Sequence, residues 1–355
     1  MMKVLMAMSG GVDSSVAAKL LCDEGYECIG CTMKLYDNCD AGLPRGRTCC
    51  SLDDVEDARS VAFSLGMRYY VFNFKDDFRE KVIKKFASGY LRGQTPNPCI
   101  DCNRYMKFDK LFERAKLLGC DKIATGHYAR IEFDGRKYRL KKALDKSKDQ
   151  SYVLYMLTQE QLAHALFPLG SLHKTDTRAI ADTAGLLSAH KPDSQDICFV
   201  PDGDYAAAIE RLAGIKAPCG NFIDASGKVI GTHRGITHYT VGQHRGLGLS
   251  LPERRYVCSI DAENSTVTLG GNDELYSSTA EVRGFNWISG ETPAEPIRCT
   301  AKIRYRQPEQ PATAIAHKDG SITIQFDAPQ RAVTPGQAAV LYDGDTVLGG
   351  GEIVR

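Results

Sequence analysis

The sequence predicts an α/β protein in which a parallel-sheet, nucleotide-binding domain is followed by a small β-rich linker domain and a C-terminal β-barrel domain. Apolar runs of strand length alternate with helical periodicities in the first half of the chain. The turn Ser9-Gly10-Gly11 joins the first of these strands to the first helix. From Cys219 onward the pattern changes to short alternating strands separated by turn signals such as Asp319-Gly320. The three domains are expected at residues 1–205, 206–271 and 272–355.

The composition is that of an ordinary globular protein with several domains. The chain has 355 residues, of which 43% are hydrophobic and 25% charged, and a net charge of +1. This charge argues against indiscriminate polyanion binding but allows a local basic face. No secretory segment follows Met1-Met2-Lys3, and no apolar stretch approaches the roughly 18 residues of a membrane span. We therefore expect a cytoplasmic protein whose 13 cysteines are not a disulfide scaffold but buried, reactive or metal-binding thiols.

The first predicted strand, loop and helix have the pattern of a phosphate site. Val4 to Met8 is a short apolar run suited to the centre of a parallel sheet, and apolar residues then recur at helical spacing up to Leu21. Between them, Ser9, Gly10 and Gly11 have little or no side chain, so their N–H groups can approach an anion closely. The following helix N-terminus adds roughly half a positive charge.

The spacing excludes two common nucleotide loops. A Walker loop needs a lysine after its last glycine, and here Val12-Asp13-Ser14-Ser15 follows instead. The G-x-G-x-x-G spacing of a dinucleotide site is also absent. The run SGGVDSS resembles the pyrophosphate-binding loop of the N-type ATP pyrophosphatases, which are HUP-like PP-loop enzymes that cleave ATP between the α and β phosphates. The alternative is a serine-rich helix cap without a ligand.

Further strands are expected at 28–33, 68–72 and 121–125, with helices at 54–65, 76–91 and 109–118. In parallel sheets, ligands bind beyond the carboxyl ends of the strands. This rule groups the Ser9 loop with Met33 and with the turn Thr125-Gly126-His127-Tyr128, although Met33 could equally be a core methionine.

The remaining elements are less regular. Pro96 and Pro98 predict that residues 94–104 form a loop rather than a helix. Residues 129–142 are expected to form a hairpin that turns at Asp134-Gly135. Helices are expected at 158–166, 176–184 and 204–212.

Five motifs occur in an order that resembles the tRNA-specific 2-thiouridylases. They are SGGVDSS from Ser9, TPNP with a following CN between Thr95 and Asn103, TGHYAR from Thr125, KDQSY from Lys148 and DSQDICF from Asp193. The resemblance covers all three segments of the chain. It implies a tRNA-uridine 2-sulfurtransferase that replaces the C2 oxygen of the wobble uridine (position 34) with sulfur, using ATP and a persulfide and releasing AMP and pyrophosphate. The chemistry is consistent with the loop, because adenylation makes a poor leaving oxygen depart as AMP and the loop would bind the pyrophosphate.

The resemblance implies two catalytic cysteines and an ATP site. Cys198 would carry the persulfide, and Cys102 would attack that persulfide or help to hold the sulfur against the activated base. The alternative for each is a buried structural thiol. The implied ATP contacts, with Mg²⁺ between Asp13 and the phosphates, are Ala7, Met8, Ser9, Gly10, Gly11, Val12, Asp13, Ser14, Met33 and Gly126.

The resemblance also implies residues that contact tRNA. Those that would meet the flipped-out base are Asn97, Pro98 and Cys99. The other implied contacts are His127, Lys148, Asp149, Gln150, Arg304, Tyr305 and Gln337. Alternation along one strand would place Lys302, Arg304 and Arg306 on a single basic face, unless that face is an ordinary solvated surface. Besides tRNA, the implied partner is an upstream persulfide donor, either a cysteine desulfurase or a sulfur relay protein.

One residue departs from the family pattern. Many members have Asp where this chain has Cys99, which forms a C-x-x-C with Cys102. Cys99, Cys102 and Cys198 could ligate a 4Fe–4S cluster. Alternatively, Cys99 is a redox or spare thiol that shields Cys102 as a disulfide, or a polar replacement for Asp. Zinc bound by Cys49, Cys50, Cys99 and Cys102 is a further alternative, and the role of Cys39, Cys49 and Cys50 is otherwise unassigned.

Two rival functions remain open at this stage. Another adenylating synthetase, of the GMP synthetase or argininosuccinate synthetase kind, could use the same loop but would not need the paired cysteines. A non-catalytic tRNA-binding module could keep the fold, but the intact SGGVDSS loop argues against it.

Overall fold

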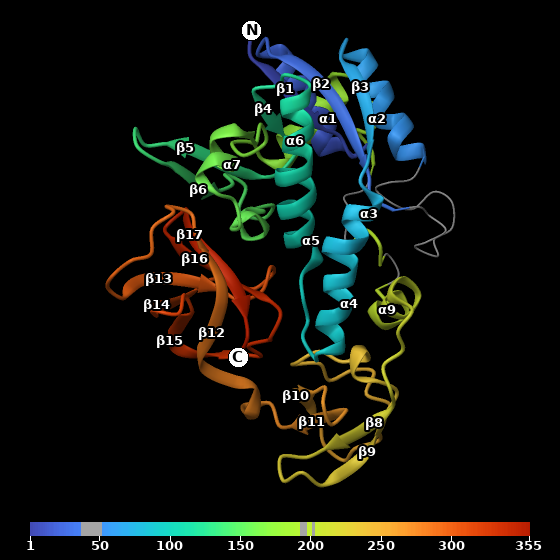
Figure 1. Ribbon diagram of the computed structural model, residues 1–355, viewed down its shortest axis with the longest axis vertical. Coiled ribbons are helices and arrows are strands. Elements are labelled where there is room, and N and C mark those ends of the chain that lie inside the picture. The colour runs from blue at the N-terminus through green and yellow to red at the C-terminus, as the bar shows by residue number, and fades with distance from the viewer. Residues whose placement is uncertain (37–51, 192–196, 201–202) are drawn as a thin grey trace.

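A five-stranded parallel sheet forms one end of the molecule (Figure 1). The computed structural model describes residues 1–36, 52–191, 197–200 and 203–355, so Cys39, Cys49, Cys50 and the start of the DSQDICF motif lie outside the described residues. The strand order is β3-β2-β1-β4-β7. The bounds are Lys3–Ala7 for β1, Glu27–Lys34 for β2, Arg68–Asn73 for β3, Lys122–Ala124 for β4 and Ala165–Leu166 for β7. Within these described ranges, no helix is both long and apolar enough to cross a membrane.

Alternate residues of β1 face opposite sides of the sheet, and each side has its own core. Val4 and Met6 pack in a cluster with α1 (Val12–Asp23), α2 (Leu52–Ser64) and α8 (Lys174–Thr183). Leu5 points into the other cluster. That second cluster takes side chains from these helical segments: α3 (Lys75–Phe78), η1 (Arg79–Ile83), α4 (Lys84–Leu91), α5 (Pro98–Asp101), η2 (Cys102–Lys110), α6 (Leu111–Leu117), α7 (Gln159–His164) and α9 (Tyr205–Ala213).

Two of the predicted helices differ from expectation at one end. The run predicted at 158–166 is helical only to His164, and Ala165–Leu166 is instead strand β7, which pairs with β4. Pro168 prevents this helix from continuing through it, because in a helix its ring would clash with the carbonyl of His164, four residues earlier. The helix predicted at 109–118 starts much earlier, at Pro98.

The expectation of a loop over the whole of 94–104 is therefore wrong. Pro98 occupies the first turn of α5, where its missing N–H costs no hydrogen bond. The Asn97 side chain caps the helix by accepting the Cys99 N–H at 3.1 Å. From Pro98 the chain continues without a break through the π-helical segment η2 into α6. Cys99 and Cys102 consequently lie on the first turns of a long helix.

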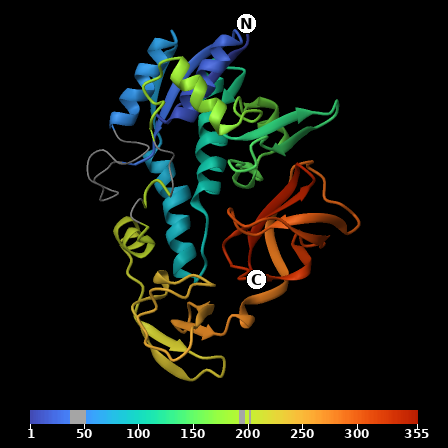
Figure 2. The same cartoon turned by 180° about the vertical axis from the view of Figure 1, so that it is seen from behind.

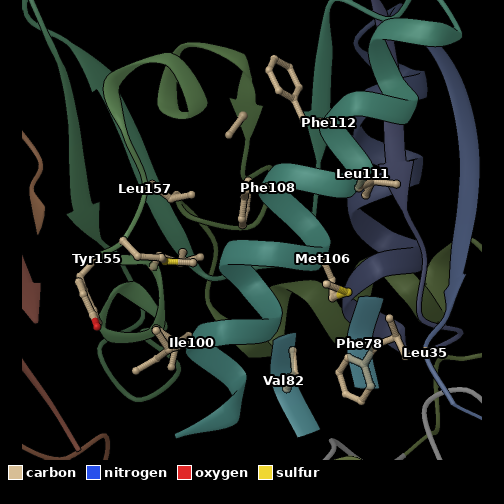
Figure 3. Close-up of a cluster of buried hydrophobic side chains, with 14 of the residues drawn as sticks. Leu35, Phe78, Val82, Ile100, Met106, Phe108, Leu111, Phe112, Tyr155 and Leu157 are labelled. Atoms are coloured by element: carbon tan, nitrogen blue, oxygen red, sulfur yellow. The ribbon is translucent and has the colours of Figure 1, made fainter. Parts of the chain in front are cut away.

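The two long helical runs, α3–α4 and α5–α6, pack side by side beneath the sheet. Each contains a π-helical segment, η1 or η2, and π segments are frequent at functional sites. Figure 3 shows Phe78 and Val82 of the first run beside Met106 of the second. In Figure 1 both runs extend from the sheet toward the central domain.

The central domain is a small sheet of order β10-β11-β8-β9. Its strands are Gly220–Ile223 (β8), Val229–His233 (β9), Tyr256–Asp261 (β10) and Thr266–Gly270 (β11). Phe222 is fully buried and meets the rings of His233 and Tyr239 edge to face. Short 3₁₀ segments also occur outside the sheets: η3 (Ser151–Leu154), η4 (Ile236–His238) and η5 (Asp273–Leu275).

The last domain is a closed six-stranded barrel, which confirms the predicted C-terminal β-barrel domain. Its strand order β12-β15-β14-β13-β16-β17 is closed by pairing of β12 with β17. The predicted hairpin, β5 (Ala129–Phe133) and β6 (Tyr138–Lys142), extends this sheet through β17, so the first domain and the barrel share main-chain hydrogen bonds. The barrel strands, seen from behind in Figure 2, are Tyr276–Trp287, Ile297–Lys302, Gln310–Ala316, Ile322–Arg331, Ala338–Asp343 and Thr346–Ile353 for β12 to β17.

The basic strand face expected from Lys302, Arg304 and Arg306 is not formed. Strand β13 ends at Lys302, and Arg304 lies in the following turn. Its Nη2 atom donates to the Val241 carbonyl at 3.0 Å, in the central domain, and to Thr334 Oγ1 at 2.6 Å, in the barrel. Burial lowers the pKa of this guanidinium. Arg304 therefore joins two domains, because its several N–H donors can satisfy oxygen atoms from both at once.

Candidate active site

The turn after β1 forms the predicted nucleotide loop, Ser9–Ser14. Gly10 has a φ of +78°, in the left-handed region that favours glycine. Gly11 caps α1 in an extended conformation. The first hydrogen bond of the helix runs from the Ser15 N–H to the Gly11 carbonyl at 3.2 Å. The N–H groups that precede it have no partner within the helix and point out of its N-terminus, where an anion can accept them.

Serine hydroxyls fix the shape of this loop from within. Ser14 Oγ accepts the Ser9 N–H at 3.1 Å and donates to the Gly11 carbonyl at 3.0 Å. Ser15 Oγ donates to the same carbonyl, also at 3.0 Å. The serines therefore shape the loop but do not cap α1, whose N-cap is Gly11 without a side-chain cap hydrogen bond. The loop is preorganised before any ligand binds.

Two glycines allow other segments to contact the loop backbone. A Cβ atom on Gly10 would overlap the carbonyl oxygen of Asp54, at the start of α2. A Cβ on Gly126 would lie 2.9 Å from the Asp13 carbonyl carbon and the Ser14 nitrogen. The turn after β4 thus packs directly on the first turn of α1. The expected grouping of the loop, this turn and Met33 at one sheet edge is confirmed, since Met33 lies at the carboxyl end of β2 beside β1.

Asp13 connects the loop to the turn after β4 and to α8. Its Oδ1 atom accepts hydrogen bonds from the Tyr128 hydroxyl at 3.0 Å and from Lys174 Nζ at 2.6 Å. The Tyr128 hydroxyl also lies 2.9 Å from Thr177 Oγ1 of α8, within hydrogen-bond distance. This network joins the turn after β4, the first turn of α1 and helix α8.

The segment from Leu186 to Lys191 lies across the N-termini of α1 and α2. Ser188 Oγ donates to Ser15 Oγ at 2.9 Å, and Arg178 of α8 donates to the Ala189 carbonyl at 2.7 Å. Lys191 Nζ contacts Asp54 at 2.9 Å and also pairs with Asp57. This segment leads directly toward Cys198 in the sequence.

Cys102 and Cys198 are both tied to the helical run α3–α4. Asp101, next to Cys102, is buried and pairs with Lys85 of α4 at 2.7 Å. Burial raises the pKa of Asp101, while Lys85 acts in the opposite direction. Phe199, next to Cys198, packs edge to face on Phe78 and Phe86 of the same run, with ring centroids 5.8 and 5.5 Å apart.

Both candidate cysteines are half-buried and pack against the same hydrophobic cluster. The Tyr36 hydroxyl fixes the backbone of Cys198 by donating to its carbonyl oxygen at 2.8 Å. Cys99, one turn before Cys102, is exposed. Over the described ranges, no three His, Cys, Asp or Glu side chains gather closely enough to hold a metal ion. Cys99, Cys102 and Cys198 are therefore not assembled as ligands of one metal centre in this arrangement.

Models of one family match almost the whole chain. The tRNA methyl transferase HUP domain matches residues 2–202, the tRNA methyl transferase PRC-barrel domain 212–271, and the aminomethyltransferase beta-barrel domain 277–353. The chain is 52% identical to the tRNA-specific 2-thiouridylase MnmA of Acetivibrio thermocellus over 355 residues, 99% of each chain. The chain belongs to the tRNA-specific 2-thiouridylase family. Other relatives are the MnmA 2 protein of Caldanaerobacter subterraneus subsp. tengcongensis (51% identity, 99% of this chain and 98% of that protein) and MnmA of Clostridioides difficile (48%, 99% and 98%).

In this thiouridylase chain, two of the predicted tRNA-contacting groups lie where the first domain meets the barrel. The Tyr305 hydroxyl donates to the Asp149 carbonyl at 3.5 Å, and the ring is 37% exposed. Burial raises the pKa of Tyr305, with smaller contributions from the nearby Asp149 and Cys99. Gln337 Nε2 donates to the Thr95 carbonyl at 2.6 Å, and so fixes the loop that leads to Asn97.

Other predicted tRNA-contacting side chains have partners inside the protein. Asp149 accepts the Ala143 N–H at 2.9 Å and the Ser151 hydroxyl at 2.8 Å. Gln150 accepts the Tyr128 N–H at 3.0 Å. Lys148 is half-buried beside them. These contacts shape the segment after the hairpin and hold it against the nucleotide site.

Four residues complete the surroundings of the loop although the sequence did not indicate them as site residues: Tyr128, Lys174, Ser188 and Lys191. Tyr128 lies within the TGHYAR motif, which is a usable signal. Lys174 and Ser188 belong to no motif, and only the packing of α8 and its following segment on α1 brings them to the loop.

His127 is buried among aromatic rings and keeps its imidazole neutral. Its Nδ1 lies 2.6 Å from Thr125 Oγ1, and Lys107 Nζ lies 3.3 Å from Nε2. Burial lowers the pKa of His127 well below its usual value, and the Lys107 charge adds to the effect. With 7% of its surface exposed, this side chain supports the fold of the turn.

The buried imidazole predicts a loss of stability in acid. Below about pH 6.5 the unfolded chain protonates His127 while the folded chain does not, so stability should fall by up to about 1.4 kcal/mol per pH unit. In His127→Gln this contribution is absent, so the difference in melting temperature between wild type and variant should shrink as the pH falls from 7.5 to 5.5. The control is His190→Gln, whose side chain is 92% exposed. A wild-type to His127→Gln difference that stays constant with pH would contradict the buried neutral state.

Proposed function

We propose that this chain is an ATP-dependent tRNA-uridine 2-sulfurtransferase that adenylates the C2 oxygen of the wobble uridine and then replaces it with sulfur. The observation that carries the proposal is a preorganised, lysine-free nucleotide loop in the same domain as two cysteines anchored on one helical run. Membership of the 2-thiouridylase family supports it.

The loop suits cleavage of ATP between the α and β phosphates. The N–H groups from Gly10 to Asp13 and the dipole of α1 would stabilise the pyrophosphate that departs. Ala7, Met8 and Gly126 line the same edge of the sheet, and Met33 would contact the nucleoside. Asp13 supplies the carboxylate of the loop, a hard ligand of the kind Mg²⁺ takes. Because its Oδ1 already accepts two hydrogen bonds, Mg²⁺ would be held mainly by the phosphates.

The sulfur step follows from the electron balance. Cys198 would carry a persulfide, Cys–S–SH, received from a cysteine desulfurase or a sulfur relay protein. The Cys102 thiolate attacks the inner sulfur, the S–S bond breaks and the terminal sulfur leaves as hydrosulfide, while a Cys102–Cys198 disulfide forms. Hydrosulfide attacks C2 of the adenylated uridine, and AMP departs with the former C2 oxygen. A cellular dithiol then reduces the disulfide for the next cycle.

The tRNA would lie across the boundary between the first domain and the barrel. Asn97, Pro98 and Cys99, at the start of α5, would meet the extruded base; of these, Pro98 is buried and Cys99 is exposed. Tyr305, Lys148 and the segment around Gln337 border the same boundary. A cytoplasmic location suits a reaction on tRNA.

The 4Fe–4S alternative requires a rearrangement. Its three cysteines, Cys99, Cys102 and Cys198, do not form a metal-binding group among the described residues. The persulfide route needs only Cys102 and Cys198, whose neighbours Asp101 and Phe199 both contact the α3–α4 run. Iron analysis of anaerobically reconstituted wild type and Cys99→Asp decides between them, since stoichiometric iron lost in Cys99→Asp would favour the cluster.

The loop assignment predicts a loss of adenylation in Gly10→Ala. Ala at this position would both strain the backbone and collide with Asp54, so tRNA-dependent AMP and pyrophosphate release should fall roughly a hundredfold, the scale of a lost anion-stabilising donor. Gly135→Ala is a matched control, because Gly135 also has a positive φ, +94°, but an added Cβ meets no atom within 4 Å. Equal AMP release by both variants would refute the loop assignment. AMP release by wild type without tRNA would favour a different adenylating synthetase.

The cysteine assignment separates activation from sulfur transfer. Cys198→Ser and Cys102→Ser should each abolish 2-thiouridine, measured by mass spectrometry of tRNA nucleosides, while Cys198→Ser still releases AMP. Cys219→Ser, at an exposed cysteine in the central domain, should thiolate normally. Wild-type 2-thiouridine in Cys198→Ser or Cys102→Ser would exclude the persulfide route.

A further inference from the structure

Lys174 is a largely buried cation at the edge of the nucleotide loop. It is the first residue of α8, and its Nζ lies 2.6 Å from Asp13 Oδ1 in the first turn of α1. The Lys174 side chain is only 12% exposed, whereas that of Asp13 is 33% exposed. Removing an ammonium group from water is costly, so a charged partner or ligand is expected there.

Asp13 has favourable contacts besides its ion pair with Lys174. It lies in the first turn of α1, where the helix dipole already favours an anion. The Tyr128 hydroxyl donates to the same Oδ1 atom at 3.0 Å. Asp13 thus keeps a hydrogen bond and a favourable field if the ammonium moves away.

The loop itself lacks the cation that its ligand would require. ATP and pyrophosphate carry several negative charges, and a helix N-terminus offers roughly half a positive charge. No lysine or arginine occurs between Ser9 and Ser15. A second lysine near the loop, Lys191, is held by two carboxylates, Asp54 and Asp57. Lys174 is paired with the one carboxylate that belongs to the loop.

We propose that Lys174 binds the β and γ phosphates of ATP, and pyrophosphate after cleavage, and so supplies from α8 the charge that Walker loops take from a lysine of their own. The inference rests on the proposed function and adds a residue to its nucleotide site. In the unliganded chain the ammonium is held on Asp13. When a polyphosphate occupies the loop, rotation about the terminal bonds of the lysine side chain transfers the ammonium to phosphate oxygens. The AMP moiety does not contact Lys174.

The test is direct binding of inorganic pyrophosphate to the full chain by calorimetry. Lys174→Met should weaken pyrophosphate binding about tenfold or more, the scale of a lost hydrogen bond to a charged group, and leave AMP binding unchanged. Lys174→Arg should retain most of the affinity. Lys19→Met is the matched control, because Lys19 lies on α1 and pairs with Asp23 at 2.7 Å, away from the loop; it should bind pyrophosphate like wild type.

A variant that removes both charges of the Lys174–Asp13 pair distinguishes phosphate binding by Lys174 from a purely structural ion pair. If Lys174 only neutralises Asp13, Asp13→Asn/Lys174→Met should recover wild-type pyrophosphate affinity, and that recovery would overturn the proposal. If Lys174 binds phosphate, the double variant stays weak although its charge is balanced and its melting temperature is close to that of wild type. Equal pyrophosphate binding by wild type and Lys174→Met would also overturn it. Absence of ATP and pyrophosphate binding by wild type would instead contradict the proposed function itself.

Discussion

Close approach of backbone to backbone at the nucleotide loop is the constraint on which the rest of the site depends. Gly10 and Gly126 leave no space for a side chain, so the start of α2 and the turn after β4 rest directly on the loop. The serine hydroxyls then fix the loop from inside. With its shape fixed in advance, the loop can present N–H groups to an anion without a cost of rearrangement, which is the condition for effective electrostatic stabilisation.

The second organising feature is the helical run α3–α4. It holds Cys102 through the buried Asp101–Lys85 pair and Cys198 through the aromatic packing of Phe199. The segment before Cys198 also rests on the nucleotide loop through Ser188. The candidate nucleotide loop and the two candidate cysteines thus lie in one domain, whose helices and following segment contact both.

The sequence predicted the fold class and the loop well because both depend on local patterns. A buried strand, small residues and an apolar helix stripe follow one another between Val4 and Leu21. The helix start was wrong because Pro98 was weighed as a breaker, although the first helical turn tolerates proline. Arg304 was misplaced because strand alternation was extended past Lys302 into a turn. Lys174 could not be found, since its contact with Asp13 joins residues far apart in sequence and depends on how α8 packs on α1.

The central claim is that the C2 oxygen of the wobble uridine is activated as an AMP ester before sulfur replaces it. The most direct measurement is a single turnover with tRNA that carries ¹⁸O at C2 of that uridine, followed by mass spectrometry of the released AMP. The account predicts that AMP gains one ¹⁸O atom for each 2-thiouridine formed, while pyrophosphate remains unlabelled. Unlabelled AMP, with the ¹⁸O recovered in water or pyrophosphate, would contradict it.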